Sequence, residues 1–212
     1  MIVLDLEWNS GSDYPGFDEI LQIGAVRIKT LGGCILDTFN IYVKPQVNTT
    51  LHPAAVKLPE LWHSFADGVC FPVAYLKFRE WAQHEKNYAA WGEDDFRILQ
   101  QNVMFWNLPP LSIRAACNLQ RGFGQHLGTN AQIALCRAVA YCKISEIFTF
   151  HDALNDAMYA ALLTSWITLH DLVVPPRTAG FRHCWRWPST LFLPPTKKRS
   201  KYLPSVQAVL SF

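Results

Sequence analysis

The chain has 212 residues, half of them hydrophobic, and a formal net charge of +2. A chain of this length and composition can bury a full hydrophobic core, and no apolar run reaches the roughly 18 residues of a membrane helix. The opening MIVLDLEW also lacks the basic start of a secretory signal, so we expect a cytoplasmic protein with no membrane segment.

The charge is unevenly distributed along the chain. Residues 1–171 carry 12 basic and 17 acidic side chains, whereas residues 172–212 carry seven basic and no acidic ones. We therefore predict two parts, a domain over residues 1–171 and a basic, proline- and tryptophan-containing extension over residues 172–212.

Three strands are predicted near the start of the chain. Residues 1–7, 19–28 and 35–43 are apolar runs, and the short connections between them favour an antiparallel meander. Because side chains alternate along a strand, Asp5 and Glu7 point to the same face and can reach one metal ion.

The next elements predict a mixed sheet. An amphipathic helix over 71–83 precedes a short buried strand over 87–91, and a helix begins at the acidic residues of DDFRILQQNVMFW. Asp95 would lie at the carboxyl end of the strand, where open α/β sheets place their sites. Further helical patterns cover 131–142 and 152–170.

The last helical pattern begins beside His151 and Asp156. On one continuous helix these two side chains would diverge by about 140°. We therefore expect His151 just before the helix on a mobile loop, with Asp152 near the N-cap and Asp156 on the helix itself.

The acidic groups at these places suggest a metal site. Two carboxylates about 5 Å apart repel by roughly 3 kcal/mol at an effective dielectric near 20, so a cluster of them must take up protons or bind divalent cations. Oxygen ligands favour Mg²⁺ or Mn²⁺, and a pair of such ions supports phosphodiester hydrolysis. A histidine beside them could take the proton of the attacking water. Each motif alone is more often surface charge or packing, but together they favour this chemistry.

Three segments resemble known exonuclease motifs. DLEW, WGEDDFRIL and FHDALNDA, in this order, are similar to the motifs of the DEDDh family, the DnaQ-like 3'→5' exonucleases, and EILQIGAVRI and IYVKP resemble the family's second and third strands. The resemblance implies a ribonuclease-H-like α/β fold, with a mixed five-stranded sheet whose first three strands are antiparallel and which helices flank. It also implies two divalent metal ions, Mg²⁺ or Mn²⁺.

The resemblance also assigns roles to residues. His151 would be the general base, and the metal ligands would be Asp5, Glu7, Asp95 and Asp156. Asp94 competes with Asp95 for the second motif, and Asp95 is preferred because Leu99 fills the apolar position four residues later.

Trp8 and Asn9 fall where the family contacts its nucleotide, and Trp91 is a third candidate for substrate binding. Stacking of an aromatic ring on a base contributes about 1–3 kcal/mol. Core packing explains Trp8 almost as well, and it explains Trp91 better. Many relatives carry a threonine-glycine-isoleucine stretch after the third strand, whereas the equivalent region here, residues 55–68, reads AVKLPELWHSFADG.

The implied activity is removal of nucleotides from single-stranded or overhanging 3' ends, releasing nucleoside 5'-monophosphates. DNA is favoured as substrate, in repair, proofreading or the trimming of fragments for CRISPR spacer integration, while the WG before the second motif is more typical of RNA 3'-end processing. A non-catalytic module that binds nucleic acid or protein is the alternative from another class. A monomer and a homodimer are both compatible with the resemblance.

The basic extension has three interpretations. Its aromatic side chains alternate with arginines, which would suit contact with a nucleic-acid strand. Packing of those aromatics on the domain explains the pattern at least as well. Docking to a protein partner is the third.

Overall fold

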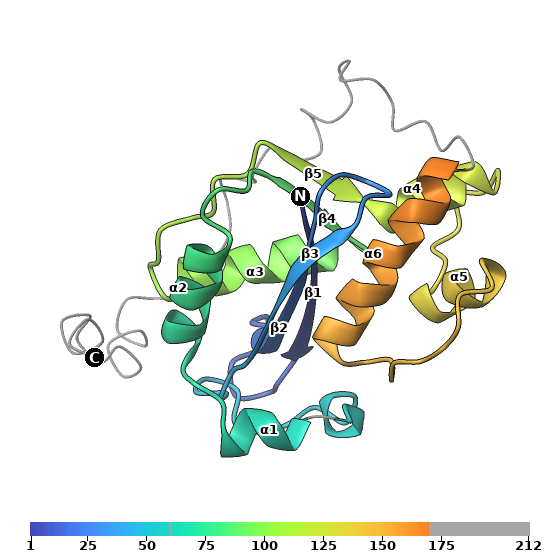
Figure 1. Ribbon diagram of the computed structural model, residues 1–212. Helices are drawn as coiled ribbons and strands as arrows, with labels where there is room; N and C mark the ends of the chain where they lie inside the picture. Colours follow the sequence, from blue (N-terminus) through green and yellow to red (C-terminus); the bar gives the residue numbers. More distant parts are fainter. Residues whose placement is uncertain (60, 170–212) are drawn as a thin grey trace.

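The computed structural model describes residues 1–59 and 61–169, so the predicted extension lies outside the described residues. The described chain forms one five-stranded sheet with helices on both faces (Figure 1). Its strands are β1 (Ile2–Asn9), β2 (Glu19–Ile28), β3 (Ile35–Tyr42), β4 (Asn87–Ala90) and β5 (Ala115–Asn118). Its helices are η1 (Ala55–Lys57), α1 (Leu61–Ala66), α2 (Phe71–Trp81), α3 (Asp94–Phe105), α4 (Leu119–His126), α5 (Leu135–Tyr141) and α6 (Ala153–Leu169).

The strand order is β3-β2-β1-β4-β5. The first three strands pair antiparallel, whereas β4 pairs parallel with β1 and β5 pairs parallel with β4. This is the predicted mixed five-stranded sheet, with its first three strands antiparallel. Because β1 and β4 run in the same direction, their carboxyl ends meet at one edge of the sheet.

The alternation of side chains divides the core into two layers. Ile2, Leu4 and Leu6 of β1 pack on one face with α2 and α3. Val3 packs on the other face with α4, α5 and α6. Asp5 and Glu7 continue the series that begins with Val3, so they lie on the face that α6 covers.

Most predicted elements agree with the structure to within a few residues. The predicted strand over 19–28 coincides with β2, and the predicted helix over 152–170 is α6. The predicted helix over 131–142 is shorter, because α5 begins only at Leu135. The sequence analysis did not locate β5, α4 or α1, although the resemblance implied a fifth strand.

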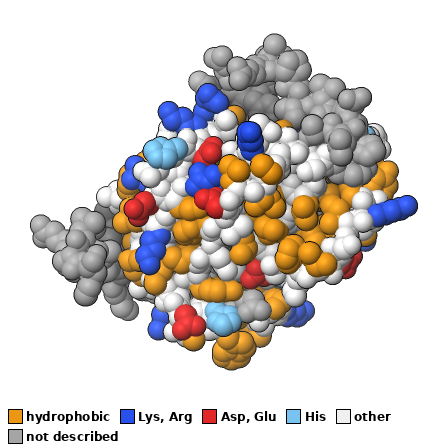
Figure 2. Space-filling view, in the orientation of Figure 1, with side chains coloured by type: hydrophobic (Ala, Val, Ile, Leu, Met, Phe, Trp, Pro, Cys, Tyr) orange, Lys and Arg blue, Asp and Glu red, His pale blue; other side chains and the backbone are white. Residues whose placement is uncertain are grey.

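Hydrophobic side chains also lie on the surface near α5 and α6 (Figure 2). The exposed fraction is 57% for Tyr141 and 73% for Ile147, which lie in or just after α5. Among the described residues, no helix combines the length and apolar character needed to cross a membrane.

Candidate active site

A cleft of about 840 Å³ opens at the edge where β1 and β4 end. One side carries acidic groups from β1, from the start of α3 and from the start of α6. α4 and the segment 129–132 supply a second group of lining residues, most of them polar. The predicted site residues that line the cleft are Asp5, Glu7, Trp8, Trp91, Asp94, Asp95, His151 and Asp156.

Asp95 is the buried member of the acidic pair at the start of α3. Its side chain is 6% exposed, and its Oδ1 accepts a 3.0 Å hydrogen bond from the backbone N–H of Leu6. Asp94 is exposed and pairs instead with Arg97 at 3.1 Å. The geometry therefore favours Asp95 over Asp94 as the residue that faces β1.

Asp156 is held in the cleft by the first turn of α6. Asp152 occupies the position before the helix, and its Oδ1 accepts a 3.0 Å hydrogen bond from the backbone N–H of Asn155, as an N-cap does. The helix can approach the sheet because β2 has a glycine beneath it: a Cβ on Gly24 would come within 2.1 Å of the Ala153 carbonyl carbon. Gly24 is also the cross-strand partner of Asp5, so the closest approach lies directly beside the site.

His151 lies immediately before the helix, where the sequence analysis expected it. Its side chain is exposed, its φ is 65°, and its backbone N–H donates a 3.2 Å hydrogen bond to Asp156 Oδ2. Such a φ is uncommon for a residue other than glycine and marks a constrained backbone.

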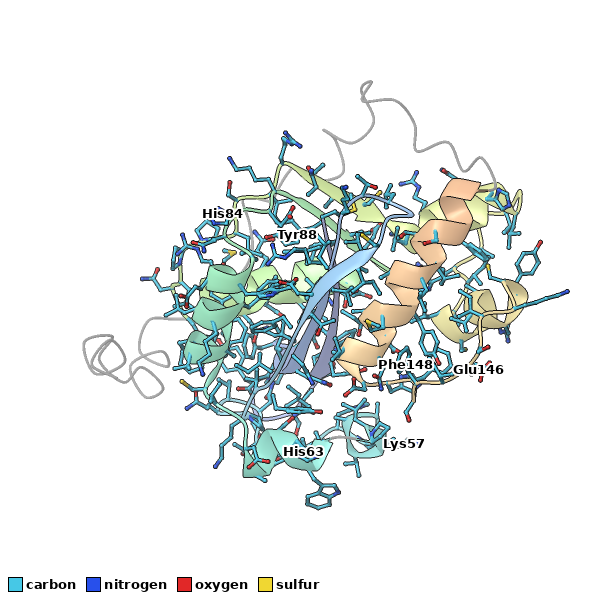
Figure 3. The ribbon with its side chains drawn as sticks, in the orientation of Figure 1. Lys57, His63, His84, Tyr88, Glu146 and Phe148 are labelled. Carbon is cyan, nitrogen blue, oxygen red and sulfur yellow. The ribbon has the colours of Figure 1, made fainter. Side chains whose placement is uncertain are left out.

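The chain leading to His151 is anchored on α6. The Tyr159 hydroxyl donates to the carbonyl oxygen of Phe148 at 2.9 Å and accepts from its N–H at 2.8 Å. Phe150 stacks on the same tyrosine ring with centroids 4.7 Å apart. Phe148 lies beside α6 in the side-chain view (Figure 3). The backbone before His151 is therefore fixed at two residues, while the imidazole faces the cleft.

Burial and mutual repulsion raise the pKa of every carboxyl group in the cluster. The pKa of Asp5 lies well above its usual range, because of burial first and then the charges of Asp95, Asp156 and Glu7. Burial and the nearby Asp156 raise the pKa of Glu7 to about 8. Burial raises the pKa of Asp95 to about 7 and that of Asp156 to about 7, although hydrogen bonds from Leu6 and His151 oppose the rise. Without a cation, this cluster therefore retains protons near neutral pH.

These residues fit a divalent cation. One potential ligand atom from each of Glu7, His151 and Asp156 lies within 4.8 Å of the others. Asp156 Oδ1 is buried and accepts no hydrogen bond from any other described residue, so it is available as a ligand atom. The charge of Asp95 contributes to the raised pKa of Asp5, but neither residue belongs to this set of three.

The three residues predicted to bind substrate have different environments in the structure. Trp8 lines the cleft and is half-buried. Trp91 is 6% exposed, and its indole N–H donates to the Ile133 carbonyl at 2.9 Å, so it forms part of the wall. Asn9 is fully buried, and its side chain bonds the backbone of Asn48, Thr50 and His52. Asn9 thus lies outside the cleft lining and holds the end of β1 against the segment that follows β3.

The region that departs from the family pattern, residues 55–68, forms η1 and α1 and contributes no residue to the described cleft lining. The sequence analysis missed a polar group of cleft-lining residues. These side chains come from the end of β5, α4 and the segment 129–132, namely Asn118, Gln120, Arg121, Gln125, Asn130 and Gln132. The signal available in the sequence was the density of amide side chains between residues 118 and 132 in a region of weak helical pattern.

The fold and the acidic cleft define a class of protein, a nuclease with the ribonuclease-H-like fold. The RNase_T exonuclease family model matches residues 2–164. The chain belongs to this family.

Three relatives illustrate the similarity. A probable 3'-5' exonuclease, KapD of Bacillus subtilis (strain 168), is 27% identical over 167 residues, which cover 76% of this chain and 80% of KapD. The crystal structure of cell-death related nuclease 4 (CRN-4) superposes with a TM-score of 0.65 at 25% identity over 79% of this chain, but the matched part spans only 63% of CRN-4. The nuclease domain of 3'hExo, described as a DEDDh family member bound to rAMP, superposes with a TM-score of 0.68 at 20% identity, over 81% of this chain and 92% of that domain.

The comparisons confirm the predicted class. The chain is a DnaQ-like 3'→5' exonuclease, and its fold, which its motifs implied, is shared with the 3'hExo nuclease domain.

Proposed function

We propose that the protein trims single-stranded or overhanging 3' ends one nucleotide at a time, with two divalent cations, Mg²⁺ or Mn²⁺, and releases nucleoside 5'-monophosphates. The observation that carries the proposal is the convergence on one cleft of four carboxyl groups from β1, α3 and α6 and of one imidazole from the segment before α6. Their raised pKa values argue that the cluster is built to exchange protons for cations.

The proposed metal ligands are Asp5, Glu7, Asp95 and Asp156. When bound, the cations would supply positive charge that acidifies the attacking water and stabilises charge on the phosphate. Asp156 stays fixed because α6 is packed against Gly24. Asp95 stays fixed because its carboxylate is bonded to β1.

His151 is the proposed general base. Its ring is exposed to the cleft and its backbone is held at a fixed angle, so the imidazole can accept the proton of a water molecule that attacks the terminal phosphodiester. The proton is then released to solvent, because this side of the cleft is open.

Two features of the walls would hold the strand. Trp8 is the proposed stacking surface for the terminal base. Arg121 is the only arginine or lysine among the described residues that line the cleft, and it is exposed. It is the proposed contact for a phosphate of the strand.

DNA is the favoured substrate, as the sequence analysis expected, and RNA is the second candidate because the structurally similar 3'hExo domain was solved with rAMP. The possible settings are repair, proofreading or trimming of CRISPR prespacers for DNA, and 3'-end processing for RNA. We also propose that the protein is cytoplasmic and that it can exist as a monomer or a homodimer. The residues after 171 are the proposed binding site for a protein partner.

One experiment tests the proposed activity, the metal-site residues and the substrate together. Matched single-stranded, blunt and 3'-overhang DNA, and the RNA of the same sequence, are digested side by side with Mg²⁺ or Mn²⁺. We expect mononucleotides from DNA with a free single-stranded 3' end, and no product after Asp5→Ala or Asp156→Ala. Full activity in either variant would remove the assignment of the metal site, and faster degradation of RNA would reverse the order of the substrates.

A further inference from the structure

The buried glutamine of β2 joins the sheet to the helix that carries Asp156. Gln22 is 3% exposed. Its Nε2 donates a 2.8 Å hydrogen bond to Asp152 Oδ2, and its Oε1 accepts a 3.1 Å hydrogen bond from the backbone N–H of Ala153. Both the nitrogen and the oxygen of the Gln22 amide therefore form hydrogen bonds with residues at the start of α6.

The orientation of this amide is fixed by its partners. A carboxylate can only accept and a backbone N–H can only donate, so the opposite orientation of the amide would place like groups against each other at both contacts. A third hydrogen bond, from Gln22 Nε2 to Asn40 Oδ1 at 3.0 Å, extends the contact to β3. The Tyr42 hydroxyl adds a 3.4 Å contact to the same oxygen of Asp152.

These hydrogen bonds connect the strand that carries Glu7 with the helix that carries Asp156. Glu7 is the cross-strand partner of Gln22 in the antiparallel pairing of β1 with β2. Asp156 lies one turn after Asp152, and its backbone N–H donates to the Asp152 carbonyl at 2.9 Å. A short path therefore runs from Glu7 across the strand pair to Gln22, then to Asp152 and up one turn to Asp156.

We propose that Gln22 is a positioning residue, which sets the separation of Glu7 and Asp156 and so the geometry of the cation site to which both carboxylates contribute. This inference rests on the proposed metal-dependent function. It goes beyond it because Gln22 is not among the residues that line the cleft and acts only through the first turn of α6.

In this proposal the hydrogen bond that Gln22 Nε2 donates to Asp152 holds the first turn of α6 in position. The substitution Gln22→Glu keeps the size of the side chain but replaces the donor with a carboxylate oxygen that faces Asp152. Repulsion should then move the first turn of α6 away from β2. The double variant Gln22→Glu/Asp152→Asn exchanges donor and acceptor across the contact, and asparagine is also a good N-cap residue. It should restore the position of α6.

The test is the affinity of the full chain for Mn²⁺, measured from the signal of free Mn²⁺ by electron paramagnetic resonance. Substitution of residues that orient metal ligands commonly costs about 10–100-fold in metal affinity, and we expect a loss in this range for Gln22→Glu. We expect the double variant to return to within about threefold of the wild type. The exposed Gln83, which follows the C-cap of α2, provides the matched control, because Gln83→Glu adds the same charge away from the cleft and should leave the affinity unchanged.

Kinetics provide a second measurement. In a single-strand digestion, Gln22→Glu should lower kcat with little change in KM, because the strand-binding wall is untouched. If Gln22→Glu does not give a cooperative melting transition, Gln22→Met takes its place, since it fills a similar volume without hydrogen bonds and should lose Mn²⁺ affinity in the same way.

Two results would overturn the inference while leaving the proposed function intact. One is wild-type Mn²⁺ affinity in a folded Gln22→Glu or Gln22→Met variant of an active enzyme. The other is a folded double variant whose affinity stays as low as that of the single variant. A wild-type protein that neither binds Mn²⁺ nor shortens a strand would instead remove the proposed function.

Discussion

The backbone N–H of Leu6 donates its hydrogen bond to Asp95 Oδ1, and this bond fixes the start of α3 to β1 between Asp5 and Glu7. Neighbouring Asp94 turns away to Arg97. Two adjacent aspartates of the same motif thus have different environments, and this difference gives the first prediction.

Asp95→Asn should reduce the rate of strand shortening by at least about 10²-fold, a loss of roughly 2.7 kcal/mol of transition-state stabilisation. Asp94→Asn removes only an exposed ion pair, whose contribution is about 0–1 kcal/mol, and should keep activity within about threefold of the wild type. The measurement is the initial rate on a 5'-labelled single strand. Equal losses in the two variants would contradict the assignment of Asp95.

The raised pKa values predict an unusual dependence of stability on pH. A carboxyl group whose pKa is higher in the folded than in the unfolded protein stabilises the fold below its unfolded pKa, and this contribution is lost as the pH rises through the folded value. For the cluster, the loss should extend from about pH 4 to about pH 8, since Asp95 and Asp156 have pKa values of about 7 and Glu7 of about 8.

The melting temperature of the metal-free protein in EDTA should therefore fall between pH 5 and pH 8.5. Mn²⁺ should raise it more at pH 8 than at pH 5.5, because the cation replaces the protons. Glu7→Gln removes one charge and should make the metal-free protein more stable than the wild type at pH 8 but not at pH 5. A melting temperature that rises with pH in EDTA, in both proteins, would argue against a crowded acidic cluster.

The role of His151 can be separated from its backbone position. His151→Ala should slow the chemical step by about 10²–10⁴-fold while leaving strand binding largely intact. Single-turnover rates at saturating enzyme measure the first effect, and fluorescence anisotropy of a labelled strand in Ca²⁺ measures the second. His151→Gly removes the same ring but accepts the φ of 65° more easily, so it serves as a control for backbone strain. If binding were lost in both variants, His151 would be a structural residue.

The sequence was sufficient for the acidic side of the cleft for a physical reason. The period of two along β1 places Asp5 and Glu7 on one face, and the strand-to-helix change at Gly92 places Asp95 at the strand's end. Each of these features is local, so a short segment is enough to predict it.

The missed parts depend on distant contacts. β5 reads AACN, which has four residues and no β-branched side chain, and α4 reads LQRGFGQH with two glycines that lower its helix propensity. Packing of Phe123 and Leu119 on the sheet forms α4 in spite of its local sequence. Asn9 was predicted as a substrate contact from its position after the first motif. Its hydrogen-bond partners lie about 40 residues further along the chain, and these bonds make it a buried structural residue.

Arg121 gives the last prediction, because a contact with a strand phosphate has a measurable salt dependence. Each phosphate contact adds about 0.7 to the slope of log affinity against log salt for a single strand, so Arg121→Ala should reduce that slope by about this amount and weaken binding similarly for all sequences. Arg121→Lys keeps the charge and should retain most of the slope. The matched control is Arg114→Ala, because Arg114 is exposed outside the cleft and bonds Asn87. Binding is measured by anisotropy between 50 and 200 mM salt, in Ca²⁺ to prevent turnover. A slope in Arg121→Ala equal to those of Arg114→Ala and the wild type would mean that the strand passes through the cleft without contacting Arg121.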